Sequence, residues 1–201
     1  MEHIFRATRT IKPPKAEYSP FIRPKDVGSK VAWQMLVRDG YLKPMYGQVA
    51  VRANQKFTPQ LRAQALRPHV PADFALAGIS AAWIYAGTTE LHNFELAFRK
   101  GANHKHAAQL NLKHPSSRVW SSADLETVTE TVEQTKVTNP HRTIIDLATR
   151  HDREVALAWM ANMAVAGIDL AATLRYVDLK NRVIGRSRIR EILQTAIEMA
   201  S

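Results

Sequence analysis

The N-terminal fold is decided by one stretch of sequence, Val27-Gly28-Ser29-Lys30-Val31-Ala32-Trp33-Gln34-Met35-Leu36-Val37-Arg38, which is followed by Asp39-Gly40. Apolar residues recur in this stretch with the 3.6-residue period of an α-helix, and a glycine stands where such a helix would end. We therefore predict a helix over 27–38 that buries most of its circumference. Its exposed line, one side chain wide, consists of Lys30, Gln34 and Arg38, at i, i+4 and i+8.

A β-hairpin is predicted directly after this helix. Two short runs of β-forming residues flank Gly47 within the segment 41–52. Pro44 cannot donate a ladder hydrogen bond, so its strand should lie at a sheet edge. A helix followed by a short basic hairpin is typical of the second half of a winged helix-turn-helix. We therefore predict such a unit over residues 25–56.

The segment ahead of this unit, residues 1–24, is predicted to be a basic, irregular arm. It contains four prolines and a basic residue at almost every third position, which favours an extended chain over a packed element. An alternative is that this segment is a disordered tail without a role. Pro20 and Pro24 also leave little room for helices before Val27, so the winged helix-turn-helix is expected to be truncated.

Residues 57–201 are predicted to form a C-terminal mixed α/β domain. Helices are expected at 58–66 and at 78–87, the second capped by Ser80 and ended by Gly87. Period-two patterns predict strands at 94–99, 107–112, 118–121 and 127–132. After Asn139-Pro140 the pattern becomes helical, with helices at 140–150, 153–166, 169–180 and 187–199 forming a cap. The predicted fold class is therefore α+β.

The charge is concentrated near the N-terminus. The chain of 201 residues has a formal net charge of +10, and residues 1–70 hold 13 Lys or Arg against 4 Asp or Glu. Such a surplus attracts polyanions, either nucleic acid or an acidic membrane surface. The sequence has no stretch of about 20 apolar residues and no secretory leader, so a cytoplasmic location is expected.

No catalytic or metal site is expected. The chain has no cysteine and none of the glycine patterns of phosphate loops, dinucleotide sites or nucleophile elbows. His104 and His106, near His92 and His114, could bind a metal, but His-x-His is a loose pattern and a polar hairpin tip is the favoured explanation. Glu95 and Lys100 lack the spacing of a nuclease pair, and their parity on a strand points them to opposite faces.

Four other residues are expected to have structural roles. Arg142 and Asp146 stand at i, i+4 on the helix after Pro140, which favours an ion pair that orients the helix over a catalytic role. Trp83 and Trp159 are expected in the core or in an interface and not as stacking platforms.

Three segments, 36–51, 80–87 and 137–148, occur in an order and at separations that resemble the AbiEi-type antitoxins and transcriptional regulators of type IV toxin–antitoxin systems. The resemblance covers about residues 25–150. It implies a winged-helix DNA-binding N-terminus, a mixed α/β C-terminal domain and no enzymatic activity or cofactor. It also implies repression of the protein's own promoter and a nucleotidyltransferase-like toxin as genetic partner, without a stable complex. In this resemblance Lys30, Gln34 and Arg38 match the recognition-helix face, and Lys43 and Arg52 match the wing.

The predicted function is therefore duplex DNA binding. Arg38 and Gln34 are residue types that can specify guanine and adenine, whereas basic residues of the wing and arm are suited to phosphates. The phosphate-contacting set comprises Lys43, Arg52, Arg6, Arg9, Lys12 and Lys15. Two alternatives remain, a protein–protein interaction module with a degenerate winged helix and an enzyme that processes nucleic acid. A continuous basic stripe favours DNA, an apolar patch on the same face favours a protein partner, and buried carboxylates beside a pocket favour an enzyme.

Overall fold

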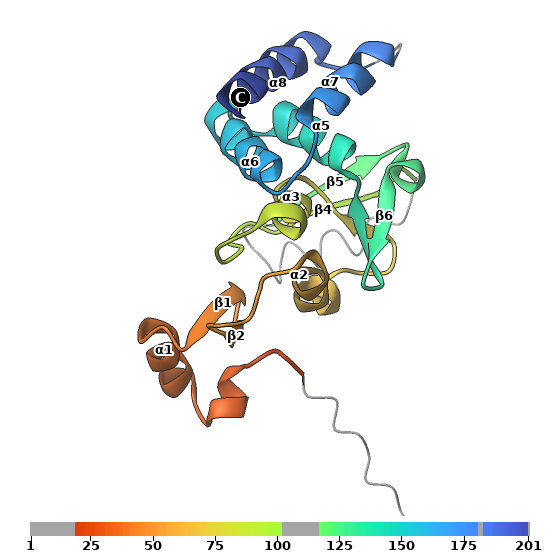
Figure 1. Cartoon of the computed structure of the whole chain (residues 1–201). Helices are drawn as coiled ribbons and strands as arrows, with labels where there is room; N and C mark the ends of the chain where they lie inside the picture. Colours follow the sequence, from red (N-terminus) through yellow and green to blue (C-terminus); the bar gives the residue numbers. More distant parts are fainter. Residues whose placement is uncertain (1–18, 102–116, 181–182, 201) are drawn as a thin grey trace, which may run out of the picture.

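The chain is described by a computed structural model that covers residues 19–101, 117–180 and 183–200. A small N-terminal unit lies beside a larger body, and the C-terminal helices lie on the side of the body away from that unit (Figure 1). The unit contains η1 (Pro24–Val27), α1 (Lys30–Arg38), β1 (Leu42–Tyr46) and β2 (Val49–Arg52). Two sheets and helices in separate segments confirm the α+β class.

The body is built on a five-stranded sheet of order β5-β4-β3-β7-β6. Its strands are β3 (Phe74–Leu76), β4 (Glu95–Arg99), β5 (Arg118–Ser122), β6 (Thr129–Val132) and β7 (Thr135–Thr138). The pairs β3–β4 and β6–β7 are antiparallel, and β3–β7 and β4–β5 are parallel. Three of these strands were predicted, whereas β3 and β7 were missed. The strand predicted at 107–112 lies outside the described residues.

Helices pack against this sheet and against one another. Within the described residues they are α2 (Pro59–Leu66), η2 (Arg67–His69), α3 (Gly78–Ala86), η3 (Leu125–Thr127), α5 (Pro140–Arg150), α6 (Arg153–Val165), α7 (Leu170–Leu179) and α8 (Arg186–Ala200). The four helices predicted after Asn139 are confirmed, and α5 and α6 pack against α3 while α8 packs across them. The Asn139 side chain accepts a hydrogen bond from the Arg142 amide at 2.9 Å, as its predicted capping role requires.

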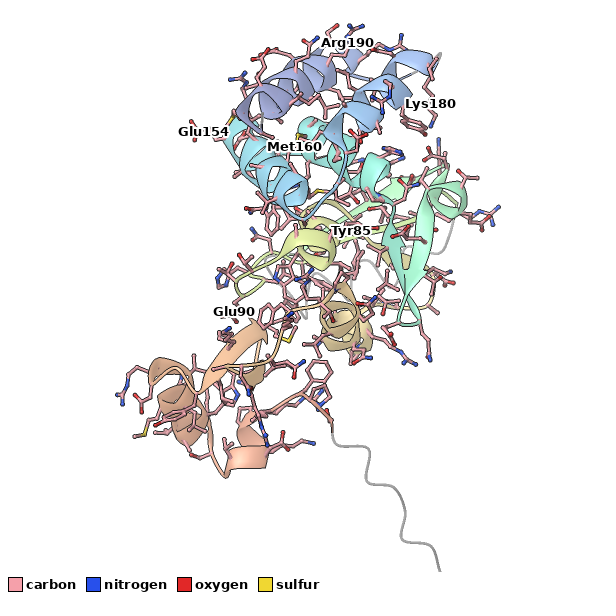
Figure 2. All side chains as sticks on the ribbon, in the orientation of Figure 1. Tyr85, Glu90, Glu154, Met160, Lys180 and Arg190 are labelled. Carbon is pink, nitrogen blue, oxygen red and sulfur yellow. The ribbon has the colours of Figure 1, made fainter. Side chains whose placement is uncertain are left out.

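One continuous core joins these elements. Trp83 is fully buried in it, as expected, and Trp159 packs against its edge. Tyr85, labelled in Figure 2, lies on α3, and its hydroxyl lies 2.8 Å from the Thr138 carbonyl at the end of β7. The sheet and α3 are therefore held together by both apolar packing and a polar contact.

The expected cap of α3 is wrong. The helix begins at Gly78, and the Ser80 hydroxyl instead accepts a hydrogen bond from the Glu95 amide of β4 at 2.8 Å. The Glu95 carboxylate takes the capping role, because its Oε2 accepts from the Ile79 amide at 2.7 Å. A residue from a neighbouring strand thus satisfies the start of this helix.

In the part of the chain that the structure describes, no single helix is long and apolar enough to cross a membrane. Only α6 and α7 taken together reach such a length, and that pair is bent by 118°.

Candidate nucleic-acid interface

Two short helical segments, not one longer helix, precede the hairpin. The predicted helix over 27–38 is wrong at its start, because Gly28 has a φ of +89° and Ser29 is extended. Val27 therefore ends η1, and α1 begins at Lys30. The Ser29 hydroxyl caps α1 by accepting from the Ala32 amide at 3.0 Å, and the Asp26 carboxylate accepts from the Arg23 amide at 2.7 Å. A helical turn, a tight bend and a second helix follow one another here.

A small core fixes one side of α1. Trp33 is only 8% exposed and packs with Leu42 and Ala50 of the hairpin. Its indole Nε1 donates to the Ile22 carbonyl at 3.1 Å. Ile22, expected in the arm, bridges antiparallel to Ala50 through two backbone hydrogen bonds of 2.8 and 3.0 Å. The segment before η1 thus lies beside β2 as a third, single-residue strand.

The opposite side of α1 is wider than predicted. Lys30, Gln34 and Arg38 are exposed, as expected. Val31 and Met35 are exposed as well, by 65% and 48%, so the expectation of a line one side chain wide is wrong. At 3.6 residues per turn these five side chains span roughly 140° of the helix circumference. The hairpin packs against the face of α1 around Trp33.

The N-terminal unit is basic, although one cation of the exposed face of α1 is paired with an acid. Arg38 pairs with Asp39 at 2.9 Å, and both side chains remain largely exposed. Residues 19–56 nevertheless contain seven Lys or Arg against two Asp, so the unit is basic. The predicted arm contacts Arg6, Arg9, Lys12 and Lys15 lie outside the described residues.

The two hairpin residues predicted to contact DNA are exposed but do not share a face. Lys43 pairs across the hairpin with Val51, whereas Arg52 pairs with Leu42. Cross-strand partners point to the same face and neighbouring residues to opposite faces. Arg52 therefore shares the face of Leu42, which contacts α1, and Lys43 lies on the other face. The structure brings Arg52, but not Lys43, to the side of the hairpin that α1 covers.

The turn of the hairpin lies against the body. The Leu91 amide donates to the Met45 carbonyl at 2.7 Å, and Tyr46 bridges parallel to Leu91. The Tyr46 ring stacks on Phe94 with ring centroids 5.2 Å apart. Glu90, labelled in Figure 2, marks the loop that the hairpin approaches. The turn that would be the tip of a wing is thus anchored to the body.

This anchoring makes the stability dependent on pH in the alkaline range. Burial raises the pKa of Tyr46 from 10.0 to about 12. Between these values the unfolded chain has lost the phenol proton while the native chain keeps it, so the contribution is intact below pH 10 and is lost as the pH rises towards 12. Between pH 9 and pH 11.5 the wild type should lose about 2 kcal/mol more unfolding free energy than Tyr46→Phe. Urea titrations at both pH values measure this difference, and parallel losses in the two proteins would contradict it.

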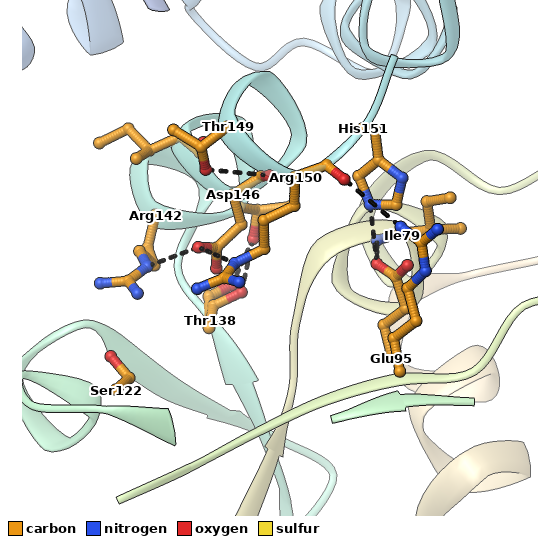
Figure 3. A network of polar contacts seen from close by, with 12 residues as sticks. Ile79, Glu95, Ser122, Thr138, Arg142, Asp146, Thr149, Arg150 and His151 are labelled. Atoms are coloured by element: carbon orange, nitrogen blue, oxygen red, sulfur yellow. Dashed lines mark hydrogen bonds and ion pairs between the residues drawn. The ribbon is translucent and has the colours of Figure 1, made fainter. Parts of the chain in front are cut away.

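A cluster of charged side chains in the body is formed by residues of α5 and by Asp124 (Figure 3). Arg142 contacts Asp146 at 3.0 Å, as the i, i+4 prediction required, and also Asp124 at 2.7 Å. Asp146 lies 3.6 Å from Arg150 as well. Burial raises the pKa of Asp146 although both arginines oppose this shift. The cluster ties α5 to the loop after β5.

Beside it, Glu95 contacts His151 at 3.1 Å, and both side chains are buried (Figure 3). Because Glu95 also caps α3, a Cβ at Gly78 would lie 2.1 Å from its Oε2, and Gly78 has a φ of +50°. In the sequence, Glu95 stands out only in a pair with Lys100 that lacks the spacing of a nuclease site, and nothing there points to His151. Lys100 is exposed beyond the end of β4. Glu95 and His151 thus connect β4 to the start of α3 and to the end of α5.

Of the four candidate metal ligands, only His92 lies within the described residues. His92 is exposed on the loop before β4, whereas His104, His106 and His114 lie outside the described residues. Among residues 19–101, 117–180 and 183–200, no three His, Asp or Glu side chains are grouped so that they could hold a metal ion.

No protein-family model and no curated protein matches the sequence. Among solved structures, the crystal structure of RV2827C protein from Mycobacterium tuberculosis is similar with a TM-score of 0.43 and 15% sequence identity. The alignment covers 90% of this chain and 73% of that chain. At this level of similarity nothing follows about function.

Proposed function

We propose that this protein is a DNA-binding transcriptional regulator whose helix α1 lies in the major groove. The observation that carries the proposal is the solvent-facing side of α1, which presents Lys30, Gln34 and Arg38 while Trp33 anchors the opposite side. A helix held in this way can enter the major groove, where donor and acceptor patterns distinguish all four base pairs. Arg38 is suited to guanine O6 and N7, and Gln34 to adenine N6 and N7.

The order of elements supports the same proposal. A winged helix-turn-helix has the order strand, helix, recognition helix and two-stranded wing. Here the Ile22 bridge takes the place of the strand, η1 that of the helix, α1 that of the recognition helix and the hairpin that of the wing. In this interpretation, the helix before the recognition helix is reduced to the single 3-10 turn η1. Arg52 on the α1 side of the hairpin would hold phosphate together with the basic arm, and Lys43 would contribute from the other face.

The biological role in the proposal comes from the resemblance of segments 36–51, 80–87 and 137–148 to AbiEi-type antitoxins. The protein would act in the cytoplasm, without a cofactor or a catalytic activity of its own. It would repress its own promoter and oppose a nucleotidyltransferase-like toxin without forming a stable complex with it.

A fluorescence titration tests the proposal. The full chain is titrated with a labelled duplex from its own upstream region and with a scrambled duplex of equal composition, at several salt concentrations. We expect tighter binding to the upstream duplex and a linear fall of log K with log salt, with a slope of about −0.9 for each phosphate contacted. Equal binding to both duplexes, or no binding at low salt, would contradict the proposal.

Removing the acid next to Arg38 should strengthen binding. Asp39→Asn deletes the partner that lies 2.9 Å from Arg38 and removes a negative charge from the proposed DNA face. An acid at a helix C-terminus is also unfavourable for the helix, so the fold should not suffer. We expect about two- to fivefold tighter DNA binding, as for the loss of one exposed charge. The matched control Asp73→Asn changes an exposed carboxylate of the body. Equal affinities of the two variants would refute a DNA-facing Arg38.

One observation favours a second candidate function, a protein-interaction module. Val31, Met35 and Tyr41 are large, apolar and exposed near one another in the sequence of the unit. If this surface binds protein, the full chain will show no salt-dependent affinity for either duplex. Two results therefore separate the candidates: the salt slope, and whether Met35→Asp weakens DNA binding or abolishes a protein contact.

A further inference from the structure

The exposed face of α1 carries apolar side chains, which make no favourable contact with phosphates. Val31 and Met35 are exposed by 65% and 48%. On the helical wheel they follow directly after Arg38, at roughly 100° and 140° from Lys30 when Arg38 stands at roughly 80°. The polar line and the apolar pair therefore form one continuous surface.

We infer that Val31 and Met35 contact the C5-methyl groups of thymines in the duplex that α1 reads. This inference rests on the proposed function and names the base that the remaining half of the face recognises. In the major groove thymine differs from cytosine by its O4 acceptor and by its methyl group, and apolar side chains read that methyl. Sites bound by this protein thus contain thymine beside the guanine or adenine that Arg38 and Gln34 read.

The surroundings of the pair favour DNA over a protein as its occupant. The pair is small and follows Arg38 on the helical wheel, and residues 19–56 carry seven Lys or Arg against two Asp, of which Asp39 pairs with Arg38. A protein partner would have to bury these cations, whereas a duplex brings phosphates to them.

Replacing thymine by deoxyuridine removes only the methyl group and leaves every hydrogen-bonding atom of the base in place. The full chain first selects its preferred duplex from a random library, and each thymine in that duplex is then replaced by deoxyuridine in turn. We expect one or two positions at which the wild type binds the deoxyuridine duplex about three- to fivefold more weakly, as for the loss of one buried methyl. At the same positions Met35→Ala or Val31→Ala should bind the two duplexes equally.

The control is Met199→Ala, which shortens a methionine that is 64% exposed on α8 and should keep the preference of the wild type. Thermal unfolding of each variant confirms that the fold is intact. Equal wild-type affinity for both duplexes at every thymine, or a selected site without thymine, would overturn the inference and leave the proposed function standing. A chain that selects no sequence at all would contradict both.

Discussion

Replacing Arg62 by methionine should lower the free energy of unfolding by about 4 kcal/mol, or prevent folding altogether. Arg62 is 4% exposed, and its guanidinium donates to four backbone carbonyls at 2.7–2.9 Å. Three of these, the carbonyls of Ile84, Tyr85 and Gly87, belong to the end of α3. A helix leaves its last carbonyls without partners, so Arg62 satisfies groups that methionine cannot.

Burial also lowers the pKa of Arg62 to about 10, which still leaves it charged at neutral pH. The fourth carbonyl, that of Phe57, belongs to the linker between the hairpin and α2, so Arg62 also fixes the start of the body. Arg67→Met is the matched control, because Arg67 is exposed and should cost less than about 0.5 kcal/mol. Arg62→Lys should be intermediate, since one ammonium cannot reach the same four acceptors. If denaturant titrations give Arg62→Met and Arg67→Met the same midpoint, Arg62 does not hold α3 in this way.

The second large effect concerns α1. Lys30→Ala/Arg38→Ala should weaken binding to the upstream duplex by about ten- to a hundredfold, because a base contact of Arg38 contributes about 1–3 kcal/mol and Lys30 adds a charge contact. The variant should also lose most of its preference over the scrambled duplex. Both side chains are exposed and lie away from the Trp33 core, so the fold should be unaffected.

The matched control for charge is Lys100→Ala/Arg175→Ala, which removes two exposed cations from the body. Fluorescence titrations at three salt concentrations compare the two double variants. We expect the control to keep its preference and the α1 variant to lose it, with a salt slope smaller by about one unit for each phosphate that the variant no longer neutralises. Wild-type selectivity in the α1 variant would show that another surface reads the DNA.

Local signals were sufficient to predict the helices of the cap and the exposure of Lys30, Gln34 and Arg38. Asn139-Pro140 supplies a side-chain cap and a residue preorganised for the first turn, and Thr58 caps α2 in the same way. Neither signal depends on distant parts of the chain. The polar period of Lys30, Gln34 and Arg38 likewise required only the spacing along one helix.

The missed elements lacked such local signals. β3 is three residues long and buried on both faces, so it shows no alternation. The turn before β7 places Glu133 and Gln134 at φ of +46° and +61° without a glycine, so the sequence contains no hairpin signal there. Glu95 and His151 lie 56 residues apart, and only the tertiary fold brings them together. The exposure of Val31 and Met35 depends on which elements pack against α1, which periodicity along the helix does not reveal.

The absence of cysteine from the chain allows the most direct test of the proposal that α1 reads DNA. A single cysteine introduced as Gln34→Cys can carry a tethered iron–EDTA group, which cleaves nearby DNA strands. Gln194→Cys, at an exposed position on α8, carries the same group as the control. We expect the group at position 34 to cleave the bound upstream duplex within a few base pairs of one site, and the group at position 194 to give no such local cleavage. A bound duplex that is not cleaved from position 34, or that is cleaved equally from both positions, would contradict a reading role for α1.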